Sequence, residues 1–177
     1  MQTLIVDGYN IIHAWPSLHA TLRDRGLEDA RRALVSALAE YTAQTGIAVT
    51  VVFDAHARPG AIPSMEKLDG VTVIFGSKRS TADHVIERAA YKASQRGEGA
   101  DVVVATDDRL ERDVVGGMGV ATMGARALEA EVARVAGNVD AETRRMRDDS
   151  RRTLRVEDGL DPEVRRRLER LRRGDDG

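Results

Sequence analysis

The 177-residue chain contains no cysteine, and this absence excludes several kinds of site. Disulfide scaffolds, zinc sites with thiolate ligands, iron–sulfur clusters and cysteine nucleophiles all require that residue. The composition fits a reducing compartment, so we expect a cytoplasmic protein. Any chemistry at this protein's site must use oxygen or nitrogen groups.

The chain also has no long apolar run, few aromatic side chains and a small net charge. No apolar run reaches the roughly 18 residues of a membrane helix, and Asp7 follows only three apolar residues, so we expect neither a signal peptide nor a membrane anchor. Aromatic residues make up 3% of the chain, too few for a sheet that stacks several RNA bases. The formal net charge is −2, so a polyanion must meet a local basic patch or a bound metal ion.

Short β-branched runs alternate with longer segments of helical periodicity, a pattern typical of a parallel sheet covered by helices. We therefore predict an α/β fold. The predicted strands are residues 4–7, 47–54, 71–75, 102–106 and 120–123. The predicted helices run from residue 27 to a stop at Gly46, from a Ser80-x-x-Asp83 capping box to Gln95, from Asp108 onward, and over residues 127–136.

The composition changes near residue 138. Residues 140–177 contain twelve arginines and eleven acidic residues but few large apolar ones, so this segment cannot build a core of its own. We predict one α/β domain over residues 1–137 and a charged helical appendage over residues 138–177. The end of the appendage is a candidate basic helix, with Arg165, Arg166 and Arg167 as candidate RNA contacts.

Acidic residues follow three of the predicted strands. Asp7, Asp54 and the pair Asp107–Asp108 each stand at the carboxyl end of an apolar run. Because the carboxyl ends of parallel strands meet at one edge of a sheet, we expect these acids to face a common crevice. Asp83, in the first turn of the helix after the third strand, belongs to the same edge.

Crowded acidic groups raise one another's pKa and destabilise the fold unless a cation compensates them. Oxygen ligands without histidine or cysteine favour Mg²⁺ or Mn²⁺. Such a site suits phosphodiester hydrolysis, because the ion lowers the pKa of a bound water and stabilises charge on the phosphate. Asp54 or Asp107 alone is more often a turn residue or a helix cap, and Asp83 alone is explained equally well by a capping box with Ser80. Asp7, which Gly-Tyr-Asn follows, departs most from that pattern, and the convergence of the acids favours a metal site.

Four segments at this edge together resemble the YacP family of NYN-domain ribonucleases, which belong to the PIN-like nucleases. They are Val-Asp-Gly-Tyr-Asn-Ile-Ile at 6–12, Val-Phe-Asp-Ala-His at 52–56, Thr-Ala-Asp with Ile-Glu at 81–87, and Val-Ala-Thr-Asp-Asp at 104–108. The resemblance covers about residues 3–133. It implies a three-layer α/β/α PIN-like fold, endoribonuclease activity dependent on Mg²⁺ or Mn²⁺, and, as in characterised members, cleavage of mRNA on the ribosome.

The resemblance also assigns roles to individual residues. The implied catalytic residues are Asp7, Asn10, Asp54, Asp83 and Asp108. Among them Asp7, Asp83 and the acid of the fourth segment would bind the metal. The family usually has Thr-Ser-Asp where this chain has Thr-Asp-Asp at 106–108, so we rank Asp108 above Asp107 as that ligand.

Candidate RNA contacts lie beside the same edge. Lys78 and Arg79 precede the helix that carries Asp83 and could receive a phosphate, although a solvated loop explains them equally well. Tyr9 could stack on one base, with a core position as the alternative. His56 and His84 are possible proton carriers, but exposed histidines without a role are more common.

Two other functions remain open at this point. A catalytically weak RNA- or ribosome-binding factor could use the PIN-like body as a docking platform, although the complete acid set argues against it. A haloacid-dehalogenase-type phosphatase also has an Asp at the end of its first strand, but it needs a second acid where this chain has Tyr9. The leading hypothesis is a metal-dependent endoribonuclease that acts on single-stranded RNA.

The arginine-rich end provides a first test. Residues 165–173 contain six arginines and one glutamate, so truncation before Arg165 should weaken binding to RNA or ribosomes and reduce its salt dependence. Cleavage of a short RNA at saturation should persist, because every acid proposed above lies before residue 109. Binding titrations at two salt concentrations measure the effect. An unchanged affinity and salt slope would reject this segment as an RNA contact.

Overall fold

The computed structural model describes residues 2–54, 64–77 and 80–138. Its strands are β1 (Thr3–Asp7), β2 (Ala48–Phe53), β3 (Ser64–Leu68), β4 (Val71–Phe75), β5 (Val102–Ala105) and β6 (Ala121–Met123). Its helices are α1 (Gly8–Ala14), α2 (Pro16–Arg25), α3 (Leu27–Thr45), α4 (Ala82–Gln95), the 3₁₀ helix η2 (Gly99–Asp101) and α5 (Arg109–Gly117). A further helix begins at residue 125 and continues to residue 138.

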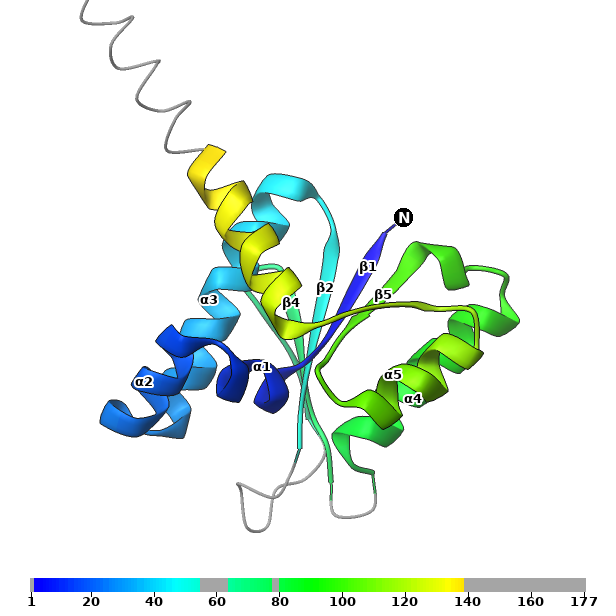
Figure 1. The fold of residues 1–177 in the computed structure, drawn as a ribbon, viewed down its shortest axis with the longest axis horizontal. Coiled ribbons are helices and arrows are strands. Elements are labelled where there is room, and N and C mark those ends of the chain that lie inside the picture. Colours follow the sequence, from blue (N-terminus) through cyan, green and yellow to red (C-terminus); the bar gives the residue numbers. More distant parts are fainter. Residues whose placement is uncertain (1, 55–63, 78–79, 139–177) are drawn as a thin grey trace, which may run out of the picture. The chain divides into compact units, whose positions relative to one another are not determined.

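Within the described residues, the strands form one six-stranded sheet in the order β3-β4-β2-β1-β5-β6. Every neighbouring pair is parallel except β3 and β4, which are antiparallel. Helices cover both faces of this sheet (Figure 1). The predicted α/β fold with a mostly parallel central sheet is therefore confirmed.

Two apolar clusters hold the layers together, one on each face of the sheet. The first joins α1, α2, α3 and the helix at 125–138, and includes Ile11, Leu34 and Leu128. The second joins α4 and α5 and includes Ile86 and Val115. The helices α3, α4 and the one at 125–138 thus each contribute one apolar side to a buried layer, as the helical periodicity of the sequence predicts. Residues 1–136 form one compact unit.

The register of the central strand positions the candidate site. β1 lies between β2 and β5, with Asp7 opposite Val52 on one side and Val6 opposite Ala105 on the other. The carboxyl ends of these three parallel strands therefore meet where Asp7 begins α1. The connections from β1 to α1 and from β5 to α5 at this edge are short.

Several predicted elements match closely. β4 and the end of α4 at Gln95 have the predicted bounds, and Gly46 ends α3 in the left-handed conformation with φ of 71°. The last helix begins two residues earlier than predicted, at residue 125. These elements have strong apolar periodicity or a clear stop residue, which explains the agreement.

Other details of the prediction were wrong. The helix cap is Thr81, which accepts a hydrogen bond from the His84 N–H at 3.4 Å, whereas Ser80 pairs with Ser77. Ser80 and Asp83 therefore do not form the predicted capping box. β3 was missed because it is an exposed edge strand without apolar alternation, and Met65 on it is 71% exposed.

None of the helices in the described part of the chain is both long enough and apolar enough to cross a bilayer. The predicted helical appendage at 138–177 lies outside the described residues from residue 139 onward, and so do Arg165, Arg166 and Arg167. Lys78, Arg79 and His56 also lie outside the described residues.

Candidate metal centre

Three carboxylates converge at the carboxyl edge of the sheet. One oxygen each from Asp7, Asp83 and Glu111 lies within 4.8 Å of the other two. Asp7 ends β1, while the other two acids lie in the first turns of α4 and α5. Asp83 is exposed, Asp7 is half-buried and Glu111 is only 4% exposed. The cluster thus has one side buried in the protein and one side open to a ligand.

Asp7 is held in place by the helix that it begins. It is the N-cap of α1, and its Oδ1 accepts a hydrogen bond from the Asn10 N–H at 3.2 Å. Burial nevertheless raises the pKa of Asp7 to about 6, with the Asn10 hydrogen bond acting in the opposite direction. Repulsion from Asp83, Asp108 and Asp54 raises this pKa further. Burial therefore outweighs the cap, and the ionised form needs a compensating charge.

Glu111 is the acid that sequence reasoning missed. It stands three residues after Asp108, the N-cap of α5, where a glutamate often bonds back to the cap residue's N–H. Here the Asp108 N–H is already donated to the Thr106 Oγ1 at 3.1 Å. The Glu111 side chain is instead buried beside Asp7 and Asp83.

The buried Glu111 carboxylate has a strong requirement for a partner. Neither of its oxygens makes a hydrogen bond of ordinary geometry within the described residues. Burial raises the pKa of Glu111 to about 7, the nearby Thr106 hydroxyl partly opposes this, and the charges of Asp7, Asp83 and Asp108 add to it. The Thr106 hydroxyl therefore does not compensate the burial of the Glu111 carboxylate, and a hard cation bound by oxygen ligands would do so.

Asp108 and Asp107 have different partners. The Oδ1 of Asp108 caps α5 by accepting from the Leu110 and Glu111 N–H groups, and its charge raises the pKa of both Asp7 and Glu111. The Oδ1 of Asp107 accepts from the Ala125 N–H at 2.8 Å. Asp107 therefore caps the helix at 125–138 and is not one of the three converging carboxylates.

Asn10 ties the two halves of the site together. Its N–H bonds to Asp7, and its Oδ1 accepts from the Asp107 N–H at 2.7 Å. The amide thus joins the start of α1 to the loop that leads into α5. Asp54 follows β2, and its charge contributes to the raised pKa of Asp7, so it lies near that acid.

The other candidates among the described residues have local roles. The Tyr9 ring packs on Phe53 with centroids 5.2 Å apart, and its hydroxyl is hydrogen-bonded to the Arg31 guanidinium. Tyr9 is half-buried and packs against the first apolar cluster. The Nδ1 of His84 lies 2.9 Å from the Thr81 hydroxyl at the start of α4.

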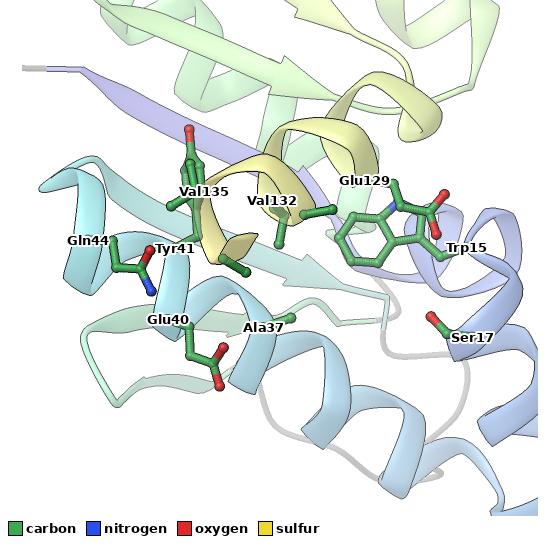
Figure 2. Close-up of a pocket in the computed structure, with 11 residues that line it drawn as sticks. Trp15, Ser17, Ala37, Glu40, Tyr41, Gln44, Glu129, Val132 and Val135 are labelled. Carbon is green, nitrogen blue, oxygen red and sulfur yellow. The ribbon is translucent and has the colours of Figure 1, made fainter. Parts of the chain in front are cut away.

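A groove of about 280 Å³ lies away from these carboxylates. The groove lies between α3 and the helix at 125–138, and Figure 2 shows Tyr41 of α3 beside Val135 of that helix, with Trp15 at the other end. Neither the three converging carboxylates nor Asp108 line it. The Trp15 Nε1–H is donated to the Ala125 carbonyl at 2.9 Å, which holds the last helix against α1.

A sequence signal for Glu111 does exist. Asp83 was found because it lies in the first turn of a helix that starts at the acid edge, and Glu111 satisfies the same condition after β5. The Asp-x-x-Glu spacing at 108–111 instead has an ordinary interpretation as a capping box. Only the structure shows that the Asp108 N–H, which such a box would pair with Glu111, is donated to the Thr106 hydroxyl instead.

Comparison with known proteins gives close matches. The family profile described as YacP-like NYN domain matches residues 4–173, which extends beyond residue 133 into the arginine-rich segment. The chain is 36% identical over 175 residues to "Uncharacterized protein YacP" of Bacillus subtilis (strain 168), with 99% of each chain covered.

Two solved structures are similar over nearly the whole chain. The crystal structure of Rae1 (YacP) from Bacillus subtilis has a TM-score of 0.68 at 36% identity, covering 99% of this chain and 97% of that one. The crystal structure of a mutant of the same Bacillus subtilis protein has a TM-score of 0.69 at 32% identity, covering 97% and 99% respectively.

The raised pKa values predict how stability depends on pH without metal. The folded protein retains protons on Asp7 and Glu111 up to about pH 6 and 7, whereas the unfolded chain loses them near the ordinary values of 3.8 and 4.5. The free energy of unfolding should therefore fall as pH rises through this window. Glu111→Gln should reduce that fall and raise the melting temperature at about pH 8 by about 2–4 °C, or about 1 kcal/mol.

Thermal unfolding in EDTA at acidic and alkaline pH measures this effect. The exposed Glu40 on α3 provides the control, since Glu40→Gln removes an equal charge away from the cluster. A variant at Glu111 that melts like the Glu40 variant at every pH would contradict the assignment.

Metal binding should stabilise the folded protein. Added Mg²⁺ or Mn²⁺ should raise the melting temperature, because an ion that binds only the folded cluster shifts unfolding by mass action; at 100 times its dissociation constant the gain is about 2.7 kcal/mol. Asp83→Asn should weaken this response, while Asp113→Asn, at an exposed position on α5, should not. No shift in calorimetric scans at millimolar metal would count against the site.

Proposed function

Because this chain belongs to the YacP-like NYN domain family, a family of nuclease-like domains, we propose that it is a metal-dependent endoribonuclease that hydrolyses phosphodiester bonds in single-stranded RNA. The observation that carries the proposal is the convergence of Asp7, Asp83 and a buried Glu111 within 4.8 Å. Three carboxylates without histidine or cysteine fit Mg²⁺ or Mn²⁺.

The residues of the cluster have distinct tasks in this proposal. Asp7, Asp83 and Glu111 hold the ion, and Asp108 adds negative charge beside them. A bound Mg²⁺ or Mn²⁺ supplies an activated water and stabilises charge on the phosphate oxygens. Asp7 and Glu111 must release their protons before they can bind the ion, because their pKa values are raised to about 6 and 7.

The geometry of the site depends on the residues around it. Asn10 fixes the start of α1 relative to the loop before α5, so it sets the separation between Asp7 and Glu111. Asp54, beside Asp7, would orient water or a further ligand. The exposed side of the cluster, at Asp83, is where an RNA phosphate would enter.

The substrate class is also part of the proposal. The motif resemblance to YacP-family ribonucleases supports RNA as the substrate, with mRNA on the ribosome as the specific form. The cysteine-free composition supports a cytoplasmic setting. The docking-platform hypothesis differs from the enzyme hypothesis in its prediction, because a platform binds RNA without cleaving it.

Asp7→Asn tests the proposal directly. It should lower metal-dependent cleavage by about 100-fold or more, because it removes a ligand charge at nearly constant volume. The melting temperature without metal should not fall, since the substitution relieves repulsion within the cluster. The assay uses labelled RNA, with and without ribosomes, in Mg²⁺, Mn²⁺ or EDTA.

The exposed Asp113 again provides the matched control, since Asp113→Asn changes charge equally at a distance from the cluster. Full activity in the Asp7 variant would remove this residue from the site. Binding without cleavage by the wild-type protein, under all these conditions, would favour the docking platform.

A further inference from the structure

One cation is buried in an interior that is otherwise almost entirely apolar. Among the described residues, the buried polar and charged ones are Arg31, Thr106 and Glu111. The last two belong to the acid edge. Arg31 is 6% exposed and lies on α3, across the sheet from α4 and α5 (Figure 1). Burial of a guanidinium is costly unless its surroundings compensate the charge.

Three aromatic rings surround the Arg31 guanidinium. Its Cζ lies 5.2 Å from the ring centre of Tyr9, 5.5 Å from that of Phe53 and 5.6 Å from that of Phe75. Each distance is within the range of a cation–π attraction. The guanidinium also hydrogen-bonds the Tyr9 hydroxyl, and its Nη1 lies 3.2 Å from the Oε2 of Glu28. We call this arrangement the Arg31 cage.

Each ring of the Arg31 cage adjoins the acid edge. Tyr9 lies two residues after Asp7, and Phe53 directly precedes Asp54. Phe75 stacks on Phe53 with centroids 5.6 Å apart and lies opposite it in the register of β2 and β4. The Arg31 cage therefore contacts the chain next to two of the acids in the proposed site.

The fit between these segments leaves no room for an added side chain. A Cβ added at Gly8, between Asp7 and Tyr9, would lie 2.2 Å from the Phe53 ring. The backbone after Asp7 thus rests directly on this ring. A shift of the Phe53 or Tyr9 ring would move the start of α1, and with it the Asp7 carboxylate.

We infer that Arg31 is a positioning residue, whose guanidinium locks the Tyr9 and Phe53 rings and thereby holds Asp7 and Asp54 in the geometry that metal-dependent cleavage requires. This inference rests on the proposed function. Arg31 is not one of the residues proposed to hold the ion. Its effect on the reaction is indirect, because small displacements of a catalytic group lower the rate steeply.

The test compares Arg31→Met with Arg32→Met. Methionine is unbranched and apolar like the arginine stem, but it is shorter and lacks the guanidinium with its charge and hydrogen-bond donors. Arg32 is the next residue of α3, exposed and paired with Asp29 at 3.4 Å, so its variant controls for loss of a helix cation. Arg31→Lys, which retains the charge but not the planar fork, should give an intermediate result.

Two readouts separate positioning from simple stability, both measured well below the unfolding midpoint of every variant. Arg31→Met should lower kcat by about tenfold or more with KM within about twofold. It should also weaken Mn²⁺ binding, followed by electron paramagnetic resonance, by about tenfold. A folded Arg31→Met protein that melts earlier but keeps wild-type kcat and Mn²⁺ affinity would overturn the inference.

A second variant covers the case in which Arg31→Met does not fold. Tyr9→Phe keeps the ring and removes only the acceptor of the Arg31 hydrogen bond. It should lower kcat in the same direction by a smaller factor, and an unchanged kcat would overturn the inference. A wild-type protein that neither binds Mn²⁺ nor cleaves RNA would instead contradict the proposed function, and the role of Arg31 would fall with it.

Discussion

The burial of carboxylates close to one another at the carboxyl edge of the sheet is the constraint on which the rest of this structure depends. The three converging acids and the neighbouring Asp108 all lie at helix N-termini, since Asp7 and Asp108 are N-caps and Asp83 and Glu111 lie in first turns. Helix N-termini stabilise negative charge. Burial nevertheless raises the pKa of Asp7 and Glu111, so the helix ends offset only part of the cost.

The sequence predicted the acid edge better than it predicted the path of the chain around it. Strong signals sufficed for β4, for the end of α4 and for the stop at Gly46. The sequence also predicted correctly that Asp7 and Asp83 lie at one edge of the sheet, because parallel strands have their carboxyl ends on the same side. The α1 and α2 helices were missed, since α1 follows Asp7 without a loop and α2 shows little apolar periodicity.

The sequence could not show which hydrogen bonds each acidic side chain makes. Glu111 was missed because its spacing from Asp108 has a sufficient local explanation. Only the resemblance ranked Asp108 above Asp107, because both acids follow the same strand and the side chain of either one can cap a helix. The separation depends on Ala125, which is far along the chain and donates its N–H to Asp107 at 2.8 Å.

The cluster draws its members from both sides of the sheet, and this has a consequence for how a bound ion would act. Asp7 ends the central strand and begins α1 in the first layer, whereas Asp83 and Glu111 belong to helices of the opposite layer. An ion held by all three would therefore link the two layers directly, in addition to the hydrogen bond by which Asn10 joins α1 to the loop before α5. The free energy of ion binding would therefore stabilise both layers against unfolding together, and not one loop alone.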